Sequence, residues 1–303
     1  MRLGDFVLQG VAGAAAFASL GLVALIVIEI VHRARPAYSA FGFSFVYRVI
    51  WDPVHDVYGA GSYLFGTVIT SFGALLLAAP LAIGIGLFLS ELAPKGILAP
   101  VTALVETLAA IPSVVIGLWG LIVLAPFLRD HVDPALHSVL GFIPLFGQAA
   151  VGPSLFTAII VLTIMILPII ASISRELFLA VPSELKEGAL GLGATRWQMV
   201  RGVSLSYSRS GIAAAMILGL GRALGEAIAV TQVIGGGTEI LWNLFTPGDT
   251  LASKIAANYQ GTSGLLETPA LLYLATILLV FSLITSVLAQ LIVRHAARQH
   301  GAQ

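Results

Sequence analysis

Six long apolar runs dominate the pattern of hydrophobic and polar positions along the chain. They cover residues 11–31, 66–90, 100–126, 153–173, 210–233 and 268–293. About 20 residues of α-helix cross a hydrocarbon core roughly 30 Å thick, so each run is long enough to span a bilayer. The second run contains no charged residue, which is difficult to explain in a soluble core helix of that length. The pattern predicts an all-α integral membrane protein with six transmembrane helices.

Composition supports the same class. Hydrophobic residues make up 58% of the 303 positions and charged residues only 10%, whereas about a quarter of the residues in an ordinary soluble domain are charged. The 15 basic residues balance the 15 acidic ones, so no net positive field attracts nucleic acid. There is no cysteine, and all six histidines lie outside the apolar runs. We therefore expect no catalytic residues and no resident metal ion.

Lysine and arginine are unevenly distributed between the two sides that six crossings create. With a cytoplasmic N-terminus, nine of these residues lie on the inner side and five on the outer side, which favours both termini in the cytoplasm. The local charges of the first run oppose this orientation, because Arg33 and Arg35 follow the run and only Arg2 precedes it. The first run is longer than the apolar part of a signal peptide, so we interpret it as a retained anchor.

Three stretches, 36–62, 127–152 and 234–266, lie on the extracytoplasmic side in this orientation. The first is rich in aromatic residues, which favour an interfacial anchor at headgroup depth over a ligand-binding role; they are Phe41, Phe43, Phe45, Tyr47, Trp51 and Tyr58. The third contains glycines and a proline that are typical of turns. Because no GxxxxGK[ST] sequence occurs in the chain, we expect it to bind no ATP.

A polar stretch, 182–206, separates the fourth and fifth runs. Its first part is typical of a helix with one apolar face, formed by Leu185, Ala189 and Leu192. Gly191 and Gly193 are expected to end this helix. Thr195 and Gln198 then match a capping box, which marks a second helix start. The sequence predicts two short helices joined by a glycine turn outside the membrane.

The same stretch resembles the EAA loop of ABC importer permeases, in which this loop is the coupling element that docks on the ATPase. The matching residues are Glu187, Gly188, Ala189, Gly193, Val203 and Leu205. Gly188 replaces the usual second alanine, and Ser206 stands where a proline is usual. The resemblance implies that Glu187, Gly188, Ala189 and Gly193 couple the chain to an ATPase, whereas the residues alone also allow a solvated connector.

Arg222 and Glu226 lie inside the fifth apolar run, four residues apart and therefore on one face of the expected helix. Charged residues are costly in a bilayer core, and they are usually buried in protein near a substrate path. The alternative is a mutual salt bridge that only fixes helix packing. Glu106, near one end of the third run, is a lesser candidate that can reach the interface.

The sequence around this pair, LGLGRALGEA at 218–227, resembles the fifth-helix signature of phosphate-specific ABC permeases. Other stretches resemble the same family: IPSVV at 111–115 with GLWG at 117–120, and WDP at 51–53 followed by YGA at 58–60 and GT at 66–67. The resemblance covers nearly the whole chain. Within this family, the chain most resembles the C subunits. The resemblance implies the type I ABC importer permease fold with cytoplasmic coupling helices.

The resemblance also implies a division of the chain. Residues 1–64 are expected to form the anchor helix and the extracytoplasmic aromatic segment. Residues 65–293 are expected to form the type 1 permease domain, with the coupling loop at 182–206. Residues 294–303 are expected to form a cytoplasmic tail.

The function that the resemblance implies is ATP-driven import of inorganic phosphate across the cytoplasmic membrane. The expected partners are a homologous A-type permease subunit, a dimeric ATP-binding subunit that uses ATP and Mg, an extracytoplasmic phosphate-binding protein and the lipid bilayer. Arg222 can hold a tetrahedral oxyanion through two parallel hydrogen bonds. Glu226 can accept the proton that phosphate carries and fully ionised sulfate lacks. A permease for sulfate or molybdate, or an ATP-independent secondary transporter, is the alternative.

Overall fold

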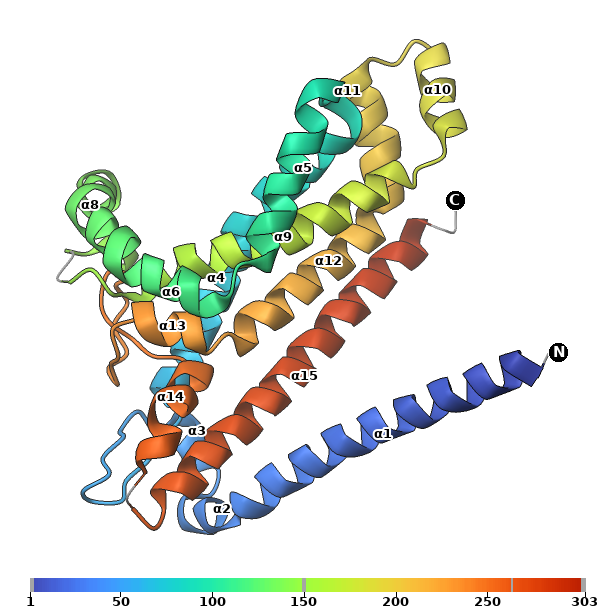
Figure 1. Cartoon of the computed structure of the whole chain (residues 1–303). Coiled ribbons are helices and arrows are strands. Elements are labelled where there is room, and N and C mark those ends of the chain that lie inside the picture. The colour runs from blue at the N-terminus through green and yellow to red at the C-terminus, as the bar shows by residue number, and fades with distance from the viewer. Residues whose placement is uncertain (1–2, 149–150, 263, 301–303) are drawn as a thin grey trace.

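A computed structural model describes residues 3–148, 151–262 and 264–300 of the chain. Arg2 and residues 301–303 of the expected tail lie outside the described residues. Within the described ranges, six helical stretches are long and apolar enough to cross a membrane, as the sequence predicts (Figure 1). They are Leu8–Arg33, Gly61–Leu92, Ser113–Leu140, Leu155–Leu179, Arg196–Gly225 and Glu267–Leu291.

The first helix, α1 (Leu3–Arg33), diverges from the rest of the bundle (Figure 1). None of the residues in its most apolar window is buried within the chain. Two short helices follow it, α2 (Arg35–Phe41) and α3 (Ser44–Tyr47). The apolar surface of α1 is therefore available to lipid or to another protein.

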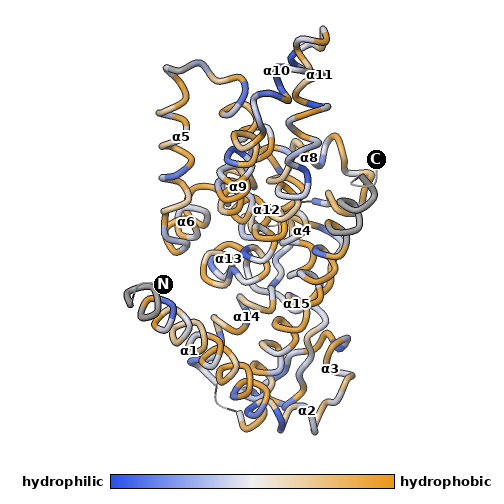
Figure 2. The backbone as a smooth tube through the Cα atoms, turned by 90° about the vertical axis from the view of Figure 1, so that its right-hand side faces the viewer, coloured by the Kyte–Doolittle hydropathy of each residue, from blue (hydrophilic) through white to orange (hydrophobic). Residues whose placement is uncertain are grey.

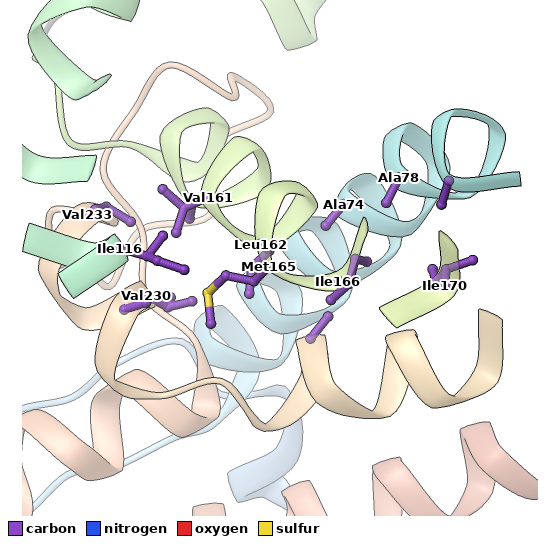
Figure 3. Packing of buried hydrophobic residues seen from close by; sticks show 14 of the residues in the cluster. Ala74, Ala78, Ile116, Val161, Leu162, Met165, Ile166, Ile170, Val230 and Val233 are labelled. Carbon is purple, nitrogen blue, oxygen red and sulfur yellow. The ribbon is translucent and has the colours of Figure 1, made fainter. Parts of the chain in front are cut away.

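The centre of the bundle consists of α4 (Gly61–Leu87), α9 (Leu155–Leu179) and α12 (Leu205–Gly225). Small residues on α4 allow α9 to approach closely; Ala74, Ala78 and Ala82 are fully buried, and they pack near Leu162, Ile166 and Ile170 of α9 (Figure 3). Pro80 and Pro168 lie inside α4 and α9, as expected, which is tolerated where neighbouring helices pack around the freed carbonyl groups. The last helix, α15 (Glu267–His300), packs on α12.

The third apolar run is broken, so the predicted span at 100–126 is wrong in its position. α5 (Lys95–Ala110) ends before Ile111, which is extended with φ −67° and ψ 128°. The ring of Pro112 disfavours helical geometry at the residue before it and provides no N–H group for the helix ladder. The spanning stretch begins only at Ser113. It comprises α6 (Ser113–Trp119), η2 (Gly120–Leu124), α7 (Ala125–Phe127), η3 (Leu128–Val132) and α8 (Asp133–Leu140).

The fifth span is also displaced from the predicted 210–233. Helix begins at α11 (Arg196–Met199), continues through the π-helical turn η5 (Val200–Ser204) into α12, and ends at Gly225. Residue 226 is extended, and a separate helix, α13 (Ile228–Val233), follows. Hydropathy extends across this break because the residues on both sides are apolar.

The segments that the sequence predicts to be extracytoplasmic contribute to a second small core. Phe45 and Tyr58 are fully buried against Leu251, Leu271 and Leu274, which belong to α14 (Leu251–Asn258) and α15. Phe43 and Tyr47 are exposed. The aromatic segment is thus only in part an interfacial anchor, because four of its six rings, Phe41, Phe45, Trp51 and Tyr58, pack in the core that includes α14 and α15. The 3₁₀ turns η4 (Pro144–Phe146) and η6 (Tyr259–Gly261) complete the described elements.

One close approach fixes α14 against α4. A Cβ atom at Gly66 would collide with the backbone oxygen of Asp249, so only glycine fits. Next to it, the Leu251 N–H donates to Thr67 Oγ1 at 2.9 Å. Burial raises the pKa of Asp249, although a hydrogen bond from Ser253 opposes that shift.

Polar residues gather at the two ends of the molecule, and apolar residues cover the long helices (Figure 2). α10 (Ser183–Gly191) and α11 lie at one end, whereas α2, α3 and α14 lie at the other (Figure 1). The N-terminal end of α1 and the C-terminal end of α15 both point toward the end of the molecule that holds α10 and α11 (Figure 1). An even number of membrane crossings requires the two ends of the chain to lie on the same side. α15 continues as helix to His300, so the described part of the expected tail, 294–300, is helical.

Candidate coupling loop and transport site

The loop between α9 and α12 has the two-helix form that the sequence predicts. α10 ends at Gly191, and Gly193 has φ +86°, a conformation that L side chains rarely adopt. The capping box is confirmed: the Gln198 N–H donates to Thr195 Oγ1 at 3.3 Å, and the Thr195 N–H donates to Gln198 Oε1 at 2.8 Å. The second helix is not independent, because α11 is the first turn of the run that becomes α12.

The outer surface of this loop exposes apolar side chains. Leu192 is 91% and Trp197 66% exposed, and Leu185 and Leu190 are also exposed. Glu187 and Gly188 are exposed as well, whereas Ala189 is half-buried. The expected single apolar face is therefore wrong in part, since Leu192 lies beyond the last helical residue. An exposed apolar patch rimmed by charged residues is typical of a protein contact surface.

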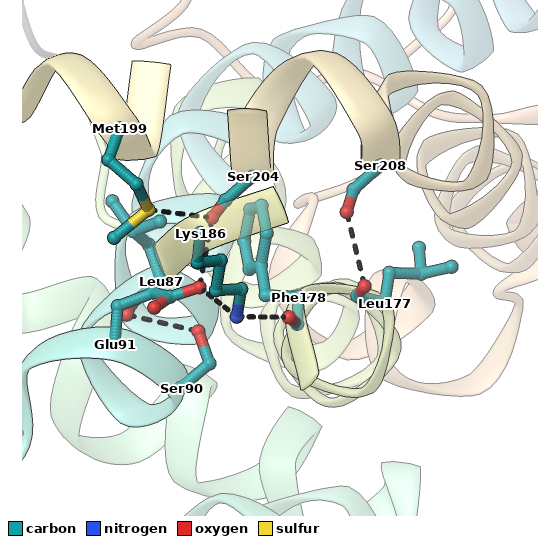
Figure 4. Close-up of polar contacts among 9 residues, drawn as sticks. All are labelled: Leu87, Ser90, Glu91, Leu177, Phe178, Lys186, Met199, Ser204 and Ser208. Carbon is teal, nitrogen blue, oxygen red and sulfur yellow. Dashed lines mark hydrogen bonds and ion pairs between the residues drawn. The ribbon is translucent and has the colours of Figure 1, made fainter. Parts of the chain in front are cut away.

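The inner side of α10 carries a buried ion pair that sequence analysis missed. Lys186 Nζ lies 2.7 Å from Glu91 Oε1 and donates to the Phe178 carbonyl at 3.1 Å (Figure 4). Ser204 Oγ donates to the same Glu91 oxygen at 3.0 Å. Glu91 lies in η1 (Phe88–Leu92), the continuation of α4. Its only signal in the sequence is that it is the first charged residue after the charge-free run 66–90.

Arg222 and Glu226 do not share a helix face, contrary to the prediction. Arg222 lies in the last turn of α12, and Glu226 follows the helix with φ −72° and ψ 112°. The Glu226 carboxylate turns forward and accepts a hydrogen bond from the Ala229 N–H at 3.3 Å, in the first turn of α13. Within the described residues, neither an ion pair nor a hydrogen bond joins the two side chains, so this structure contradicts the mutual salt bridge.

Helix ends account for this arrangement of charges. A cation is favourable near the C-terminus of a helix, where carbonyl groups have no intrahelical partner, and an anion is favourable near an N-terminus. Arg222 and Glu226 occupy these two positions at the break between α12 and α13. Discontinuous helices of this kind recur at substrate sites of membrane transporters.

Arg222 belongs to a stripe of α12 that nothing in the described chain covers. The exposed residues of this stripe are Ala214, Leu218, Gly221, Arg222 and Gly225. On the opposite side, a Cβ atom at Gly219 would lie 2.8 Å from Ile170 Cδ1, so this glycine allows α9 to pack closely. Gly221 and Gly225 have open space at the Cβ position, so within the described residues no element packs closely on them.

The remaining candidate from the sequence, Glu106, lies apart from this site. Glu106 is exposed on α5, the helix that ends before the third span. Among the described residues, no group of three or more histidine, aspartate or glutamate side chains could hold a metal ion.

A family model decides the class of the protein. Residues 82–298 match the family described as binding-protein-dependent transport system inner membrane component. The chain belongs to this family. It is a multi-pass membrane permease, with six apolar helices in its described residues.

Curated relatives of this permease are similar over nearly their whole length. The phosphate transport system permease protein PstC of Pasteurella multocida is 41% identical over 284 residues, covering 92% of this chain and 88% of the relative. The protein of the same name from Mesorhizobium japonicum is 41% identical over 304 residues, covering 99% and 93%. The probable PstC of Methanocaldococcus jannaschii is 36% identical over 263 residues, covering 84% and 83%.

Solved structures with the same fold come from ABC transporters. A permease chain of a bacterial transporter involved in the import of the acidic polysaccharide alginate has a TM-score of 0.64 at 17% identity, covering 96% of this chain and 98% of that one. An inward-facing methionine transporter MetNI has a TM-score of 0.56 at 20% identity, covering 77% and 94%. These similarities establish the type I importer permease fold.

Proposed function

We propose that this chain is a permease subunit of an ATP-driven importer and carries inorganic phosphate across the cytoplasmic membrane. Relatives named as phosphate transport permeases support the substrate. The observation that carries the proposal is Arg222, exposed on the uncovered stripe of α12 beside a helix break. The chain itself performs no bond-breaking chemistry and binds no cofactor; a separate subunit hydrolyses ATP with Mg.

A guanidinium in the apolar part of a membrane needs protein or water around it. We infer that a homologous A-type permease subunit covers the α12 stripe and that the two subunits enclose the path. Arg222 then faces the solute and holds two oxygens of the anion. Within the described residues, the Glu226 carboxylate accepts one hydrogen bond, through Oε1, which leaves its second oxygen to accept the proton of phosphate.

The coupling loop supplies the contact with the motor. In the proposed assembly, a dimeric ATP-binding subunit docks on α10 and α11 through Leu192, Trp197 and the exposed Glu187–Gly188 turn of α10. This orientation places α10, α11 and both termini in the cytoplasm. An extracytoplasmic phosphate-binding protein delivers the anion to the opposite end. An ATP-independent carrier is not favoured, because the family is that of binding-protein-dependent transport systems.

Uptake by the reconstituted complex tests the proposal. Vesicles containing both permeases and the ATPase, with the binding protein outside, are supplied with labelled phosphate, with or without internal ATP and with excess sulfate or molybdate outside. We expect uptake that requires ATP and resists both competitors. Uptake without ATP would favour a secondary transporter, and competition by sulfate or molybdate would favour another oxyanion as the substrate.

A further inference from the structure

α10 is fastened to the membrane helices through one lysine. Within the described part of the chain, Lys186 makes the side-chain hydrogen bonds that join α10 to other elements, to Glu91 at 2.7 Å and to the Phe178 carbonyl at 3.1 Å. The remaining charged side chains of α10, Glu184 and Glu187, are exposed. The position of α10 relative to the bundle therefore depends on this contact.

The hydrogen bonds of the Lys186–Glu91 pair reach three different spans. Glu91 ends the α4 run, Phe178 lies in the last turns of α9, and Ser204 lies in η5 at the start of α12 (Figure 4). Ser204 is fully buried and donates to the Glu91 oxygen that also accepts from Lys186. A single carboxylate thus joins α4, α12 and α10, and Lys186 adds α9.

Burial makes this pair difficult to separate. The side chains of Glu91 and Lys186 are 8% and 18% exposed. Breaking a buried ion pair by removing one partner leaves the other charge uncompensated, which is strongly unfavourable. In the pair of Arg175 and Glu176 at the same end of the molecule, the Arg175 side chain is 21% and the Glu176 side chain 68% exposed, so this carboxylate, unlike that of Glu91, is open to solvent.

A glycine turn follows α10. Gly193 has φ +86°, and the Ala194 N–H donates to the Ala189 carbonyl at 3.1 Å across the turn. The Lys186–Glu91 ion pair lies outside the backbone hydrogen bonds of α10 and of this turn. Its loss would therefore change the position of α10 relative to the bundle and not the folding of the helix.

We propose that Lys186 and Glu91 form the rigid joint through which movement of α10 is transmitted to α4, α9 and α12. The two are positioning residues, and the joint sets how many ATP molecules are hydrolysed per phosphate transported. This inference rests on the proposed function, because it assumes that a nucleotide-hydrolysing subunit moves α10. Without the joint, α10 still moves with the ATPase, but this movement no longer changes the positions of the transmembrane helices.

The test measures ATP hydrolysis and labelled phosphate uptake in the same reconstituted complex, for Glu91→Gln and Lys186→Met. Glu176→Gln is the matched control, since it makes the same change in an ion pair whose carboxylate is 68% exposed. We expect each joint variant to raise the ratio of ATP hydrolysed to phosphate transported by about tenfold, and the control to leave it unchanged. A merely structural defect would reduce both activities together and leave the ratio unchanged, which would overturn the proposal.

A cross-linking experiment remains informative if the single variants assemble poorly. The chain has no cysteine of its own, so Glu91→Cys combined with Lys186→Cys can be bridged by a short bismaleimide in complexes with cysteine-free partners. We expect a high ratio before bridging and a return toward the wild-type ratio afterwards. A wild-type ratio before bridging would contradict the joint. If the wild-type complex moves no phosphate with ATP, the proposed function fails instead.

Discussion

The charged groups at the two ends of the helical run from Arg196 to Gly225 differ in whether the chain itself pairs them. At the inner end, Ser204 donates to the largely buried Glu91 carboxylate, which lies 2.7 Å from the Lys186 ammonium. At the outer end, Arg222 is exposed and, within the described residues, has no hydrogen-bonding partner. Charges that the chain satisfies itself hold elements in place, whereas a charge left open is available to another chain or to a solute.

The largest effect is expected from removal of the open charge. Arg222→Ala should lower phosphate uptake by about 100-fold, because two charge-assisted hydrogen bonds to the anion together contribute about 3 kcal/mol. Basal ATP hydrolysis should persist, since the inner end is unchanged. Initial rates of labelled phosphate uptake measure the loss.

Arg209→Ala provides the control for this variant, because Arg209 lies on the same helix and is half-buried. Its uptake should stay near the wild-type value. Equal losses in both variants would show that Arg222 has no role distinct from that of another arginine on α12, and the comparison between the two ends would fail.

The next largest effect tests the glycine turn beside the inner joint. Gly193→Leu places a side chain at φ +86°, which costs about 1–2 kcal/mol, so uptake should fall by roughly tenfold. Gly193→Asn should be much milder, because asparagine tolerates this conformation. Stimulation of ATP hydrolysis by the binding protein is the readout, and similar results for the two variants would argue against a conformational role for Gly193.

Glu226→Gln tests whether the carboxylate at the outer end selects phosphate over sulfate. The amide oxygen can still accept from the Ala229 N–H, so α13 should keep its capping interaction. The new amide N–H₂ can donate to sulfate, which has no proton of its own to offer. We expect the preference for phosphate over sulfate to fall by about tenfold, measured by competition between the two anions. An unchanged preference would remove Glu226 from substrate selection.

The smallest effect should come from the start of α11. Thr195→Ala removes the side-chain half of the capping box, a loss of about 1 kcal/mol at one helix end. Uptake should fall by only two- to fivefold. Thr195→Ser retains the hydroxyl and should restore the rate, whereas a loss equal to that of the alanine variant would mean that the methyl group and not the cap matters.

The parts of the fold that a single property of the sequence determines could be predicted. Five of the six spans overlap the apolar runs closely or in large part, because burial in lipid requires about 20 apolar residues whatever the tertiary contacts are. The capping box is local, so two residues three positions apart, Thr195 and Gln198, specify it. The break at Ile111 had a signal in Pro112, but hydropathy is high on both sides and conceals it.

The candidate site was harder to predict because its geometry depends on a helix break at Gly225 that no proline marks in the sequence. Arg222 and Glu226 have the spacing of a shared helix face, yet the helix ends at Gly225 and the carboxylate turns to Ala229. The pair of Glu91 and Lys186 joins residues 95 positions apart. No local pattern encodes such a contact, and the buried hydroxyl of Ser204 gives no signal of its own.

The separation of α1 from the bundle has a consequence for how sequence change is tolerated. Since none of its apolar window is buried within the chain, its side chains are not matched in shape to partners in α4, α9 or α12. Substitutions among leucine, valine, isoleucine and phenylalanine along 8–28 should leave the thermal stability of the isolated subunit unchanged. The same exchanges in the buried stretch 158–171 of α9 would open voids or create clashes.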